Sequence, residues 1–260
     1  MSERADLVDR LRAAGCVFAE DEARMLVEAA ESEADLERMV ASRVDGLPLE
    51  TVLGAVEFAG LRLAGEPGVF VPRRRTELLV RCATEVDLAG RTVVDLCCGT
   101  GAVGAALLAA EPTITVLATD IDPAAVHNAR RNLPADAVFE GDLFAPLPQR
   151  LRGGVDLVVA NAPYVPTDHI AWMPREARLF EARVALDGGV DGLDLHRRIT
   201  ADAPHWLAPG GRLIIESSER QAAATLELAE RAGLNARVAR SAELDATAVV
   251  CTRERGAGDH

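Results

Sequence analysis

The chain has 260 residues, a formal net charge of −13, a hydrophobic content of 49% and an aromatic content of only 3%. This length predicts one catalytic domain with a smaller appendage. The excess of negative charge argues against stable binding to DNA or RNA, because phosphate groups attract surfaces rich in Lys and Arg. No apolar run reaches the roughly 18 residues of a membrane span, and the charged start lacks the apolar core of a secretory signal, so we expect no membrane association.

The five cysteines favour a reducing, cytoplasmic setting. They are odd in number and scattered, and none has the Cys-x-x-Cys spacing of a zinc site or the pattern of a disulfide framework. We therefore expect no metal. The cysteines are Cys16, Cys82, Cys97, Cys98 and Cys251.

Residues 1–65 predict a helical N-terminal domain. Apolar residues recur there at helical spacing, as at Leu7 and Leu11. Glycines and a proline between residues 60 and 68 then break the pattern and mark the passage into a second domain, residues 66–260. The expected N-terminal helices cover residues 3–13, 21–30, 34–42 and 49–56.

Strand-like and helix-like segments alternate from residue 91 onward, which predicts a parallel sheet with right-handed crossovers. The last two strand-like segments, residues 236–239 and 246–251, are separated by a short connection and should therefore be antiparallel. Residues 253–260 are expected to form a frayed tail. Earlier strands are expected at residues 92–96, 114–119, 137–140 and 155–160, with helices starting near residue 102 and covering residues 124–132 and 221–232.

A turn of small residues follows the first of these strands. Gly99 and Gly101 allow the backbone to turn sharply and approach a ligand, and with Gly104 they match Gly-x-Gly-x-x-Gly. That match alone is weak and fits a dinucleotide as well. Asp95, an acid at the end of the strand, favours the cofactor turn of methyltransferases, and the missing Walker lysine argues against a nucleoside triphosphate.

Acidic residues also follow the next two strands. Asp120, at the tip of the second strand, can accept both hydroxyls of a ribose, although an acid here fits NAD equally well. Asp122 is assigned to the N-cap of the helix that opens at Pro123. Asp142 and Leu143 follow the short third strand, and we expect them to lie beside an adenine.

The tetrapeptide Asn161-Ala162-Pro163-Tyr164 follows the apolar strand at residues 155–160. Ligands bind at this edge of open α/β sheets. The Asn161 amide can accept hydrogen bonds from a planar group and donate to it, and Tyr164 can stack on it. An ordinary turn built from Asn and Pro is the alternative.

These segments together resemble the class I S-adenosylmethionine-dependent methyltransferases, and more closely the HemK/PrmC-type protein N(5)-glutamine methyltransferases. The tetrapeptide is similar to their Asn-Pro-Pro-Tyr signature. The resemblance covers nearly the whole chain and is most specific over residues 47–54, 57–61, 70–80 and 185–193. It implies an α/β fold with a Rossmann-like, mostly parallel seven-stranded sheet that includes a terminal antiparallel strand, beside a small helical N-terminal domain that recognises the substrate.

The resemblance also implies the reaction and the site. S-adenosyl-L-methionine would supply a methyl group to the side-chain amide nitrogen of a glutamine in a peptide chain release factor or a related protein, leaving S-adenosyl-L-homocysteine. Asn161 and Tyr164 are the expected catalytic residues, and together with Ala162 and Pro163 they are expected to bind the substrate. The expected cofactor-binding residues are Phe70, Thr76, Asp95, Cys97, Cys98, Gly99, Thr100, Gly101, Asp120, Ile121, Asp142, Leu143 and Asn161.

Departures from the family pattern leave alternatives open. Ala162 replaces a proline, Cys97 and Cys98 precede the glycines of the turn, and Ser217-Ser218 stands where a glycine is usual. One alternative is a methyltransferase of the same fold that acts on a nucleobase or a small-molecule nitrogen. The other is a catalytically silent protein that binds the cofactor.

Three further groups of residues carry weaker signals. Arg73-Arg74-Arg75 is expected to be a solvated turn rather than a contact for an acidic partner. Trp172 and Met173 are candidates for shaping the substrate entrance. Surface or structural roles are expected for His127, His169, His196 and His205.

Overall fold

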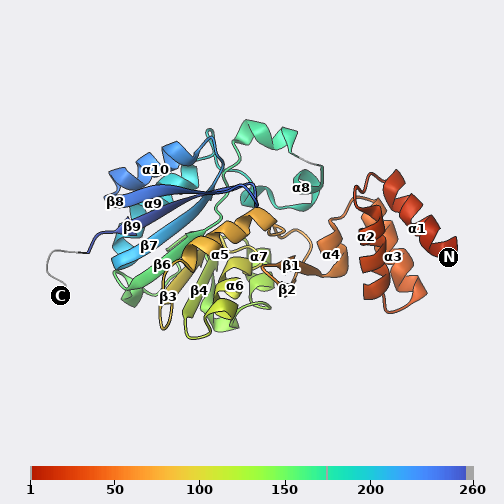
Figure 1. Ribbon diagram of the computed structural model, residues 1–260, viewed down its shortest axis with the longest axis horizontal. Coiled ribbons are helices and arrows are strands. Elements are labelled where there is room, and N and C mark those ends of the chain that lie inside the picture. Colours follow the sequence, from red (N-terminus) through yellow and green to blue (C-terminus); the bar gives the residue numbers. More distant parts are fainter. Residues whose placement is uncertain (1, 174, 256–260) are drawn as a thin grey trace.

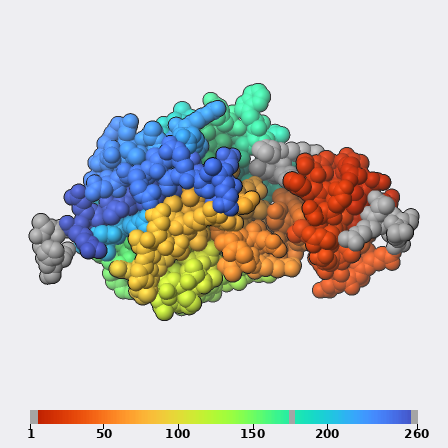
Figure 2. Space-filling view, in the orientation of Figure 1, coloured from red at the N-terminus to blue at the C-terminus, as the bar shows by residue number. Residues whose placement is uncertain are grey.

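The computed structural model describes residues 2–173 and 175–255. A sheet with helices on both faces forms the larger part of the molecule, and three N-terminal helices form a lobe at one end (Figure 1). The space-filling view shows that the lobe is joined to the larger part through the segment that follows the helices (Figure 2).

The N-terminal lobe has an apolar core of its own. It consists of α1 (Ser2–Ala13), α2 (Ala19–Ala29) and α3 (Glu33–Val44), followed by the short α4 (Leu49–Leu53). Leu11 and Leu26 are fully buried in this core. Among the residues that the structure describes, no helix in the lobe or elsewhere is long and apolar enough to cross a bilayer.

A hairpin that the sequence did not predict follows α4. Its strands, β1 (Ala55–Phe58) and β2 (Leu61–Ala64), are antiparallel, whereas a helix was expected through residue 56. The helix ends early because Gly54 takes a left-handed conformation with φ 63° and closes it as a C-cap. The buried hairpin residues Val56 and Phe58 belong to the core of the larger domain, so the hairpin packs with that domain and not with the lobe.

The large sheet has seven strands in the order β5-β4-β3-β6-β7-β9-β8. The first five strands of that order are parallel, and β9 is antiparallel to both of its neighbours. The predicted fold class is therefore confirmed. The strands are β3 (Thr92–Leu96), β4 (Thr115–Asp120), β5 (Val138–Glu140), β6 (Val155–Ala160), β7 (Leu207–Ser217), β8 (Leu234–Ser241) and β9 (Ala246–Arg253).

Helices cover both faces of this sheet (Figure 1). Val93 points to the face covered by α5 (Glu77–Ala83), α6 (Ala102–Ala110) and α7 (Pro123–Ala129). Its neighbour Val94 points to the opposite face, which α9 (Asp194–Trp206) and α10 (Ala222–Arg231) cover. A further helix, α8 (Arg175–Phe180), lies in the chain before α9. Short 3-10 turns occur at Arg74–Thr76, Ala135–Ala137, Gln149–Leu151, Thr167–Trp172 and Arg183–Ala185.

Several predicted ends differ from the observed ones by a few residues, and two of them bear on particular predictions. The helix expected at residues 124–132 runs from Pro123 to Ala129, and Asp122 caps it as predicted, because its Oδ1 accepts from the Ala124 backbone N–H at 2.9 Å. Arg253 was expected in a frayed tail, but it belongs to β9 and pairs with Leu234. Residues 256–260 of that expected tail lie outside the described residues.

The strand order reverses beside β3, because β4 lies on one side of it and β6 on the other. At such a point the two crossovers diverge and leave a crevice beyond the carboxyl ends of the strands. The register pairs Leu96 with Ala160, so Cys97 and Asn161 leave the sheet side by side. The fold therefore brings the glycine turn and the Asn-Ala-Pro-Tyr segment to one place.

Candidate active site

A cavity of about 740 Å³ lies at this crevice. Every residue predicted to bind cofactor or substrate lines it, with the exception of Gly101. Its other lining residues include Arg75, Thr119, Asp122, Met173 and Arg198.

Gly99 and Gly101 serve different purposes in the turn between β3 and α6. Gly99 lines the cavity, and a Cβ there would meet nothing closer than the Phe70 carbonyl oxygen at 3.9 Å. Gly101 faces the protein interior, where a Cβ would lie 2.9 Å from Leu133 Cδ1. Both glycines have positive φ, which other residues rarely adopt. The structure therefore places Gly101 as a packing residue behind the site.

Asp95 lies at the floor of the cavity and is only 2% exposed. Its Oδ2 accepts a hydrogen bond from the Gly104 backbone N–H at 2.9 Å. Burial raises the pKa of this carboxyl group to about 7, because the charged form loses its hydration. A cationic ligand in the cavity would favour the ionised form.

Asp120 ends β4 and joins the glycine turn to the next loop. Its Oδ2 accepts from the Gly99 N–H at 2.9 Å and its Oδ1 from the Asp122 N–H at 3.0 Å. Burial raises its pKa as well. Each carboxylate oxygen can accept a second bond, so Asp120 can hold the turn and still bind ligand hydroxyls.

The far end of the cavity has an apolar wall beside an ion pair. Leu143 is buried and Ile121 is half exposed, and both line the cavity. Asp142 forms an ion pair with Arg198 of α9 at 2.6 Å. The sequence did not predict this partner, because Arg198 lies 56 positions away in a helix without a motif.

The Asn161-Ala162-Pro163-Tyr164 segment forms the opposite wall. Asn161 Nδ2 donates to the Thr76 hydroxyl oxygen at 3.2 Å, and the Tyr164 hydroxyl donates to Glu216 Oε1 at 3.2 Å. Within the described residues, neither Asn161 Oδ1 nor the Ala162 carbonyl oxygen accepts a hydrogen bond. Asn161 is partly exposed at the cavity wall, so its Oδ1 is available to a ligand, whereas Ala162 lines the cavity but is only 1% exposed.

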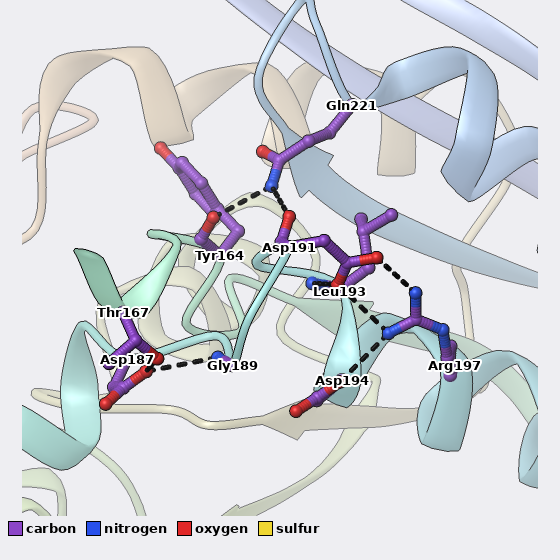
Figure 3. A network of polar contacts seen from close by, with 9 residues as sticks. All are labelled: Tyr164, Thr167, Asp187, Gly189, Asp191, Leu193, Asp194, Arg197 and Gln221. Atoms are coloured by element: carbon purple, nitrogen blue, oxygen red, sulfur yellow. Dashed lines mark hydrogen bonds and ion pairs between the residues drawn. The ribbon is translucent and has the colours of Figure 1, made fainter. Parts of the chain in front are cut away.

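The glycine-rich segment of residues 187–193 contacts this wall, and its residues Asp187, Gly188 and Gly189 also line the cavity (Figure 3). Gln221 Nε2 donates to the carbonyl oxygens of Tyr164 and Asp191, at 3.0 Å each. A Cβ on Gly188 would lie 2.8 Å from the Pro163 carbonyl oxygen, and one on Gly192 would collide with that of Tyr164. Glycine is therefore required where the two segments touch.

Polar contacts make the same segment rigid (Figure 3). Asp187 Oδ1 accepts from the Thr167 hydroxyl at 2.6 Å and from the Gly189 N–H at 3.1 Å. Asp191 forms an ion pair with Arg197 of α9. Residues that the sequence flagged only by family resemblance thus hold the Asn161–Tyr164 segment in place.

The three consecutive arginines lie at a solvent-exposed turn, as expected, and each also has an acidic partner within the chain. Arg73 forms an ion pair with Glu181, whose side chain is buried. Arg74 lies 3.5 Å from Glu243, and the Arg75 Nε lies 3.5 Å from Glu216 Oε1. Arg75 also lines the cavity, so this cluster belongs to the architecture of the site.

The remaining candidates lie at different depths. Met173 lines the cavity, whereas the Trp172 side chain is 86% exposed. His196 is buried away from the cavity, and its Nδ1 lies 2.8 Å from the Thr225 hydroxyl. Burial lowers the pKa of His196 to about 4, so it is neutral at physiological pH. This is the structural role expected for it.

A strand-order reversal, a glycine turn preceded by an acid and an acid at the next strand tip define a class I methyltransferase fold. A solved structure agrees with this class. The T. thermophilus 16S rRNA methyltransferase, solved in complex with AdoMet and guanosine, aligns with a TM-score of 0.54 at 21% identity, over 77% of this chain and 50% of that one.

Sequence comparisons give the family. The model of the methyltransferase small domain matches residues 60–189. The release factor glutamine methyltransferase of Geobacter sulfurreducens is 38% identical over 200 residues, which are 75% of this chain and 69% of that protein. The enzyme of the same name from Cereibacter sphaeroides is 38% identical over 221 residues, 83% of this chain and 77% of that protein. The chain belongs to the family of release factor glutamine methyltransferases.

The cofactor of this family, S-adenosyl-L-methionine, fits the residues of the cavity. The hydroxyl oxygens of Thr100 and Thr119 are buried at its wall without a hydrogen-bond partner in the described part of the chain. The carboxyl groups of Asp95 and Asp120 line the cavity and can supply the negative charge that a sulfonium ion favours. The cavity thus offers both the acceptors and the charge that a cationic nucleoside requires.

Proposed function

We propose that this chain methylates the side-chain amide nitrogen of a glutamine in a peptide chain release factor. The observation that carries the proposal is the 38% identity over 200 residues with a protein named for that reaction. Asn161 Oδ1 and the Ala162 carbonyl oxygen accept no hydrogen bond from the described residues, which supports it, because a primary amide has two N–H groups to donate.

In this proposal, different residues of the cavity bind the ribose, the adenine and the methionine part of the cofactor. Asp120 binds the ribose hydroxyls, and Ile121 and Leu143 enclose the adenine beside Asp142. Asp95 lies nearest the methionine part, together with Phe70. The small side chains of Cys97, Cys98 and Thr100 leave room for the close approach of the ligand to the turn.

When bound, S-adenosyl-L-methionine supplies a methyl group attached to a positively charged sulfur. An amide nitrogen is a poor nucleophile because its lone pair is delocalised into the carbonyl group. Asn161 Oδ1 and the Ala162 carbonyl oxygen would accept its two N–H hydrogens, which favours electron density on nitrogen. The new nitrogen–carbon bond would replace the carbon–sulfur bond, S-adenosyl-L-homocysteine would leave, and one of the two N–H protons would be lost to water. Holding the reacting atoms in line at about 3 Å can contribute roughly 7–11 kcal/mol. Tyr164 packs against the amide plane.

Alanine in place of the family's first proline leaves this chemistry intact. The second acceptor is a backbone carbonyl, which any residue provides. Ala162 is 1% exposed and packs in the core between the sheet and α9. That packing and the Gln221 bond to the Tyr164 carbonyl hold the loop without the stiffness of a proline.

The N-terminal lobe is proposed to recognise the protein substrate. Its separate core and its position at one end of the molecule suit a surface that contacts a large partner (Figure 2). The packing of the hairpin favours a domain boundary near residue 54 over the expected boundary at residue 65.

A transfer assay with the purified chain, S-adenosyl-L-methionine and a release factor tests the proposal. We expect one methyl group on one glutamine side chain, located by mass spectrometry of the digested release factor. Methylation of adenine or cytosine without methylation of glutamine would support the nucleobase alternative. Binding of the cofactor without transfer to any of these substrates would support the catalytically silent alternative.

A further inference from the structure

Arg198 is a residue of the cavity that the sequence did not predict. It lies in α9 three positions after Leu195, and both residues line the cavity together with Asp142 and Leu143. Ile199, the next residue of the helix, is fully buried in the core between α9 and the sheet. The backbone at Arg198 is therefore fixed relative to the sheet, while its half-exposed side chain reaches the cavity.

The acidic partner of Arg198 lies in the turn that follows β5. The Ala145 N–H donates to the Asp142 carbonyl oxygen at 3.0 Å, which closes this turn. Leu143 is buried and has a φ of 49°, a left-handed conformation that residues with a Cβ rarely adopt. A strained backbone at a cavity wall is typical of a segment that contacts a ligand.

A single hydrogen bond joins the two side chains. Arg198 Nη2 donates to Asp142 Oδ2 at 2.6 Å, and this contact is the main cause that raises the pKa of Arg198 above its ordinary value. Asp142 Oδ1 accepts no hydrogen bond from the residues that the structure describes. A bidentate pair would occupy both carboxylate oxygens, whereas the observed pair leaves Oδ1 of a half-exposed cavity residue for a ligand.

We propose that Arg198 is a positioning residue for the cofactor, which holds Asp142 through Oδ2 and thereby directs Oδ1 to the exocyclic amine of the adenine. That amine donates hydrogen bonds and a carboxylate can only accept them. The pair therefore favours adenine over a purine that carries an oxygen at the same position. The inference rests on the proposed place of the adenine beside Asp142, and not on the identity of the methyl acceptor.

A purely structural role is the alternative, in which the ion pair only ties α9 to the turn after β5. Ion pairs between half-exposed side chains contribute little to the free energy of unfolding, so the fold should survive the loss of this pair. The two roles differ in the ligands that they affect. A looser cavity wall would weaken the binding of every nucleoside in the same proportion, whereas a misdirected carboxylate would weaken mainly the binding of adenine.

Substitutions at Arg198 and Asp142 separate these roles. Arg198→Met removes the guanidinium group and keeps much of the bulk, whereas Arg198→Lys keeps the charge. Asp142→Asn places an amide, which can donate as well as accept, at the same position. Arg91→Met is the matched control, because Arg91 is exposed to nearly the same extent as Arg198 and forms an ion pair with Asp156 at 2.8 Å. It precedes β3, at the edge of the sheet opposite the cavity.

Titration calorimetry with two ligands tests the role without a methyl acceptor. The ligands are S-adenosyl-L-homocysteine and S-inosyl-L-homocysteine, which carries an oxygen in place of the adenine amine. We expect the parent and Arg91→Met to bind the adenine ligand at least about tenfold more tightly than the inosine ligand. In Arg198→Met this preference should fall by about fivefold or more, through weaker binding of the adenine ligand, and Arg198→Lys should be intermediate.

The double variant of Arg198→Met and Asp142→Asn should have the preference of Asp142→Asn alone, because Arg198 acts through Asp142. A preference in Arg198→Met equal to that of the parent would overturn the proposal, whether both ligands bind as before or both are weakened equally. Additive effects in the double variant, or a parent without any preference, would overturn it as well. An unchanged preference in Asp142→Asn would show that the adenine lies elsewhere and would refute the role of Arg198 with it. A parent that binds the cofactor but methylates no glutamine would refute the proposed function alone, because the calorimetry needs no methyl acceptor.

Discussion

Burial raises the pKa of Asp95, so that the charge of this one residue would respond to a cationic ligand. Its raised pKa of about 7 means that the free protein holds this group largely protonated below neutral pH. In the proposed site a sulfonium ion would favour the ionised form, so binding of S-adenosyl-L-methionine is expected to release a proton and to strengthen as pH rises toward 7.

We therefore expect the affinity for S-adenosyl-L-methionine to rise by up to roughly tenfold between about pH 5.5 and about pH 7. Titration calorimetry at a series of pH values measures this. Asp120 faces the same cavity and also has a raised pKa, so the Asp95→Asn variant is the reference that isolates Asp95. A pH dependence that is the same in the parent and in Asp95→Asn would contradict the assignment.

Short-range sequence patterns predicted the residues of the cavity but not the residues that support them. Asp95, Gly99 and Asp120 occur at strand ends and in a recognisable turn, so their common location follows from the parallel sheet. Glu216 and Gln221 come from segments more than 50 positions after the loop that they hold. Only the tertiary packing reveals such partners, because nothing in their local sequence marks them.

At the scale of elements, the contact between the Asn-Ala-Pro-Tyr segment and the segment of residues 187–193 decides whether the site is rigid. Gly188 and Gly192 allow the backbones to touch, and the Gln221 amide joins them (Figure 3). Two donated hydrogen bonds to carbonyl oxygens depend on one side chain.

Replacement of that amide by a carboxylate should loosen the loop. Gln221→Glu places a negative group against the carbonyl oxygens of Tyr164 and Asp191, and we expect a loss of about 1–3 kcal/mol in the free energy of unfolding. Thermal and urea denaturation measure it. Gln149→Glu is the matched control, because Gln149 is exposed and its Oε1 accepts from Arg152. Equal stability of the two variants would show that the Gln221 contact is unimportant.

Most of the strands and helices after residue 91 followed from the sequence, whereas α8, α9, β7 and the hairpin of β1 and β2 did not. Its apolar residues alternate, as at Val56 and Phe58, but the segment is short and follows directly after a helical pattern. Gly54 ends that helix, and packing against the larger domain stabilises strands that would be marginal alone. Packing against distant segments therefore decided the conformation of residues 55–64, for which the local sequence did not favour a strand over a helix.

At the scale of the whole molecule, the lobe and the larger domain have separate cores. We therefore expect that recognition of the protein substrate can be separated from cofactor binding. The lobe of α1–α3 has its own buried cluster, and the cofactor cavity lies in the larger domain. Deletion of residues 1–54 should therefore preserve cofactor binding and abolish methylation of a folded release factor. Calorimetry and the transfer assay measure the two effects, and a peptide containing the glutamine loop controls for intact chemistry. A truncated chain that methylates the whole release factor at the parent rate would make the lobe dispensable.

The central claim is that Asn161 Oδ1 accepts a hydrogen bond from the glutamine amide nitrogen that receives the methyl group. Single-turnover transfer to a release factor tests it most directly, with the parent, Asn161→Ala and a release factor whose acceptor glutamine is changed to alanine. We predict methylation of that one glutamine by the parent, a rate lower by on the order of 10²–10³ in Asn161→Ala, and no transfer to the altered release factor. Transfer by Asn161→Ala at the parent rate, or a parent that never methylates glutamine, would contradict the account.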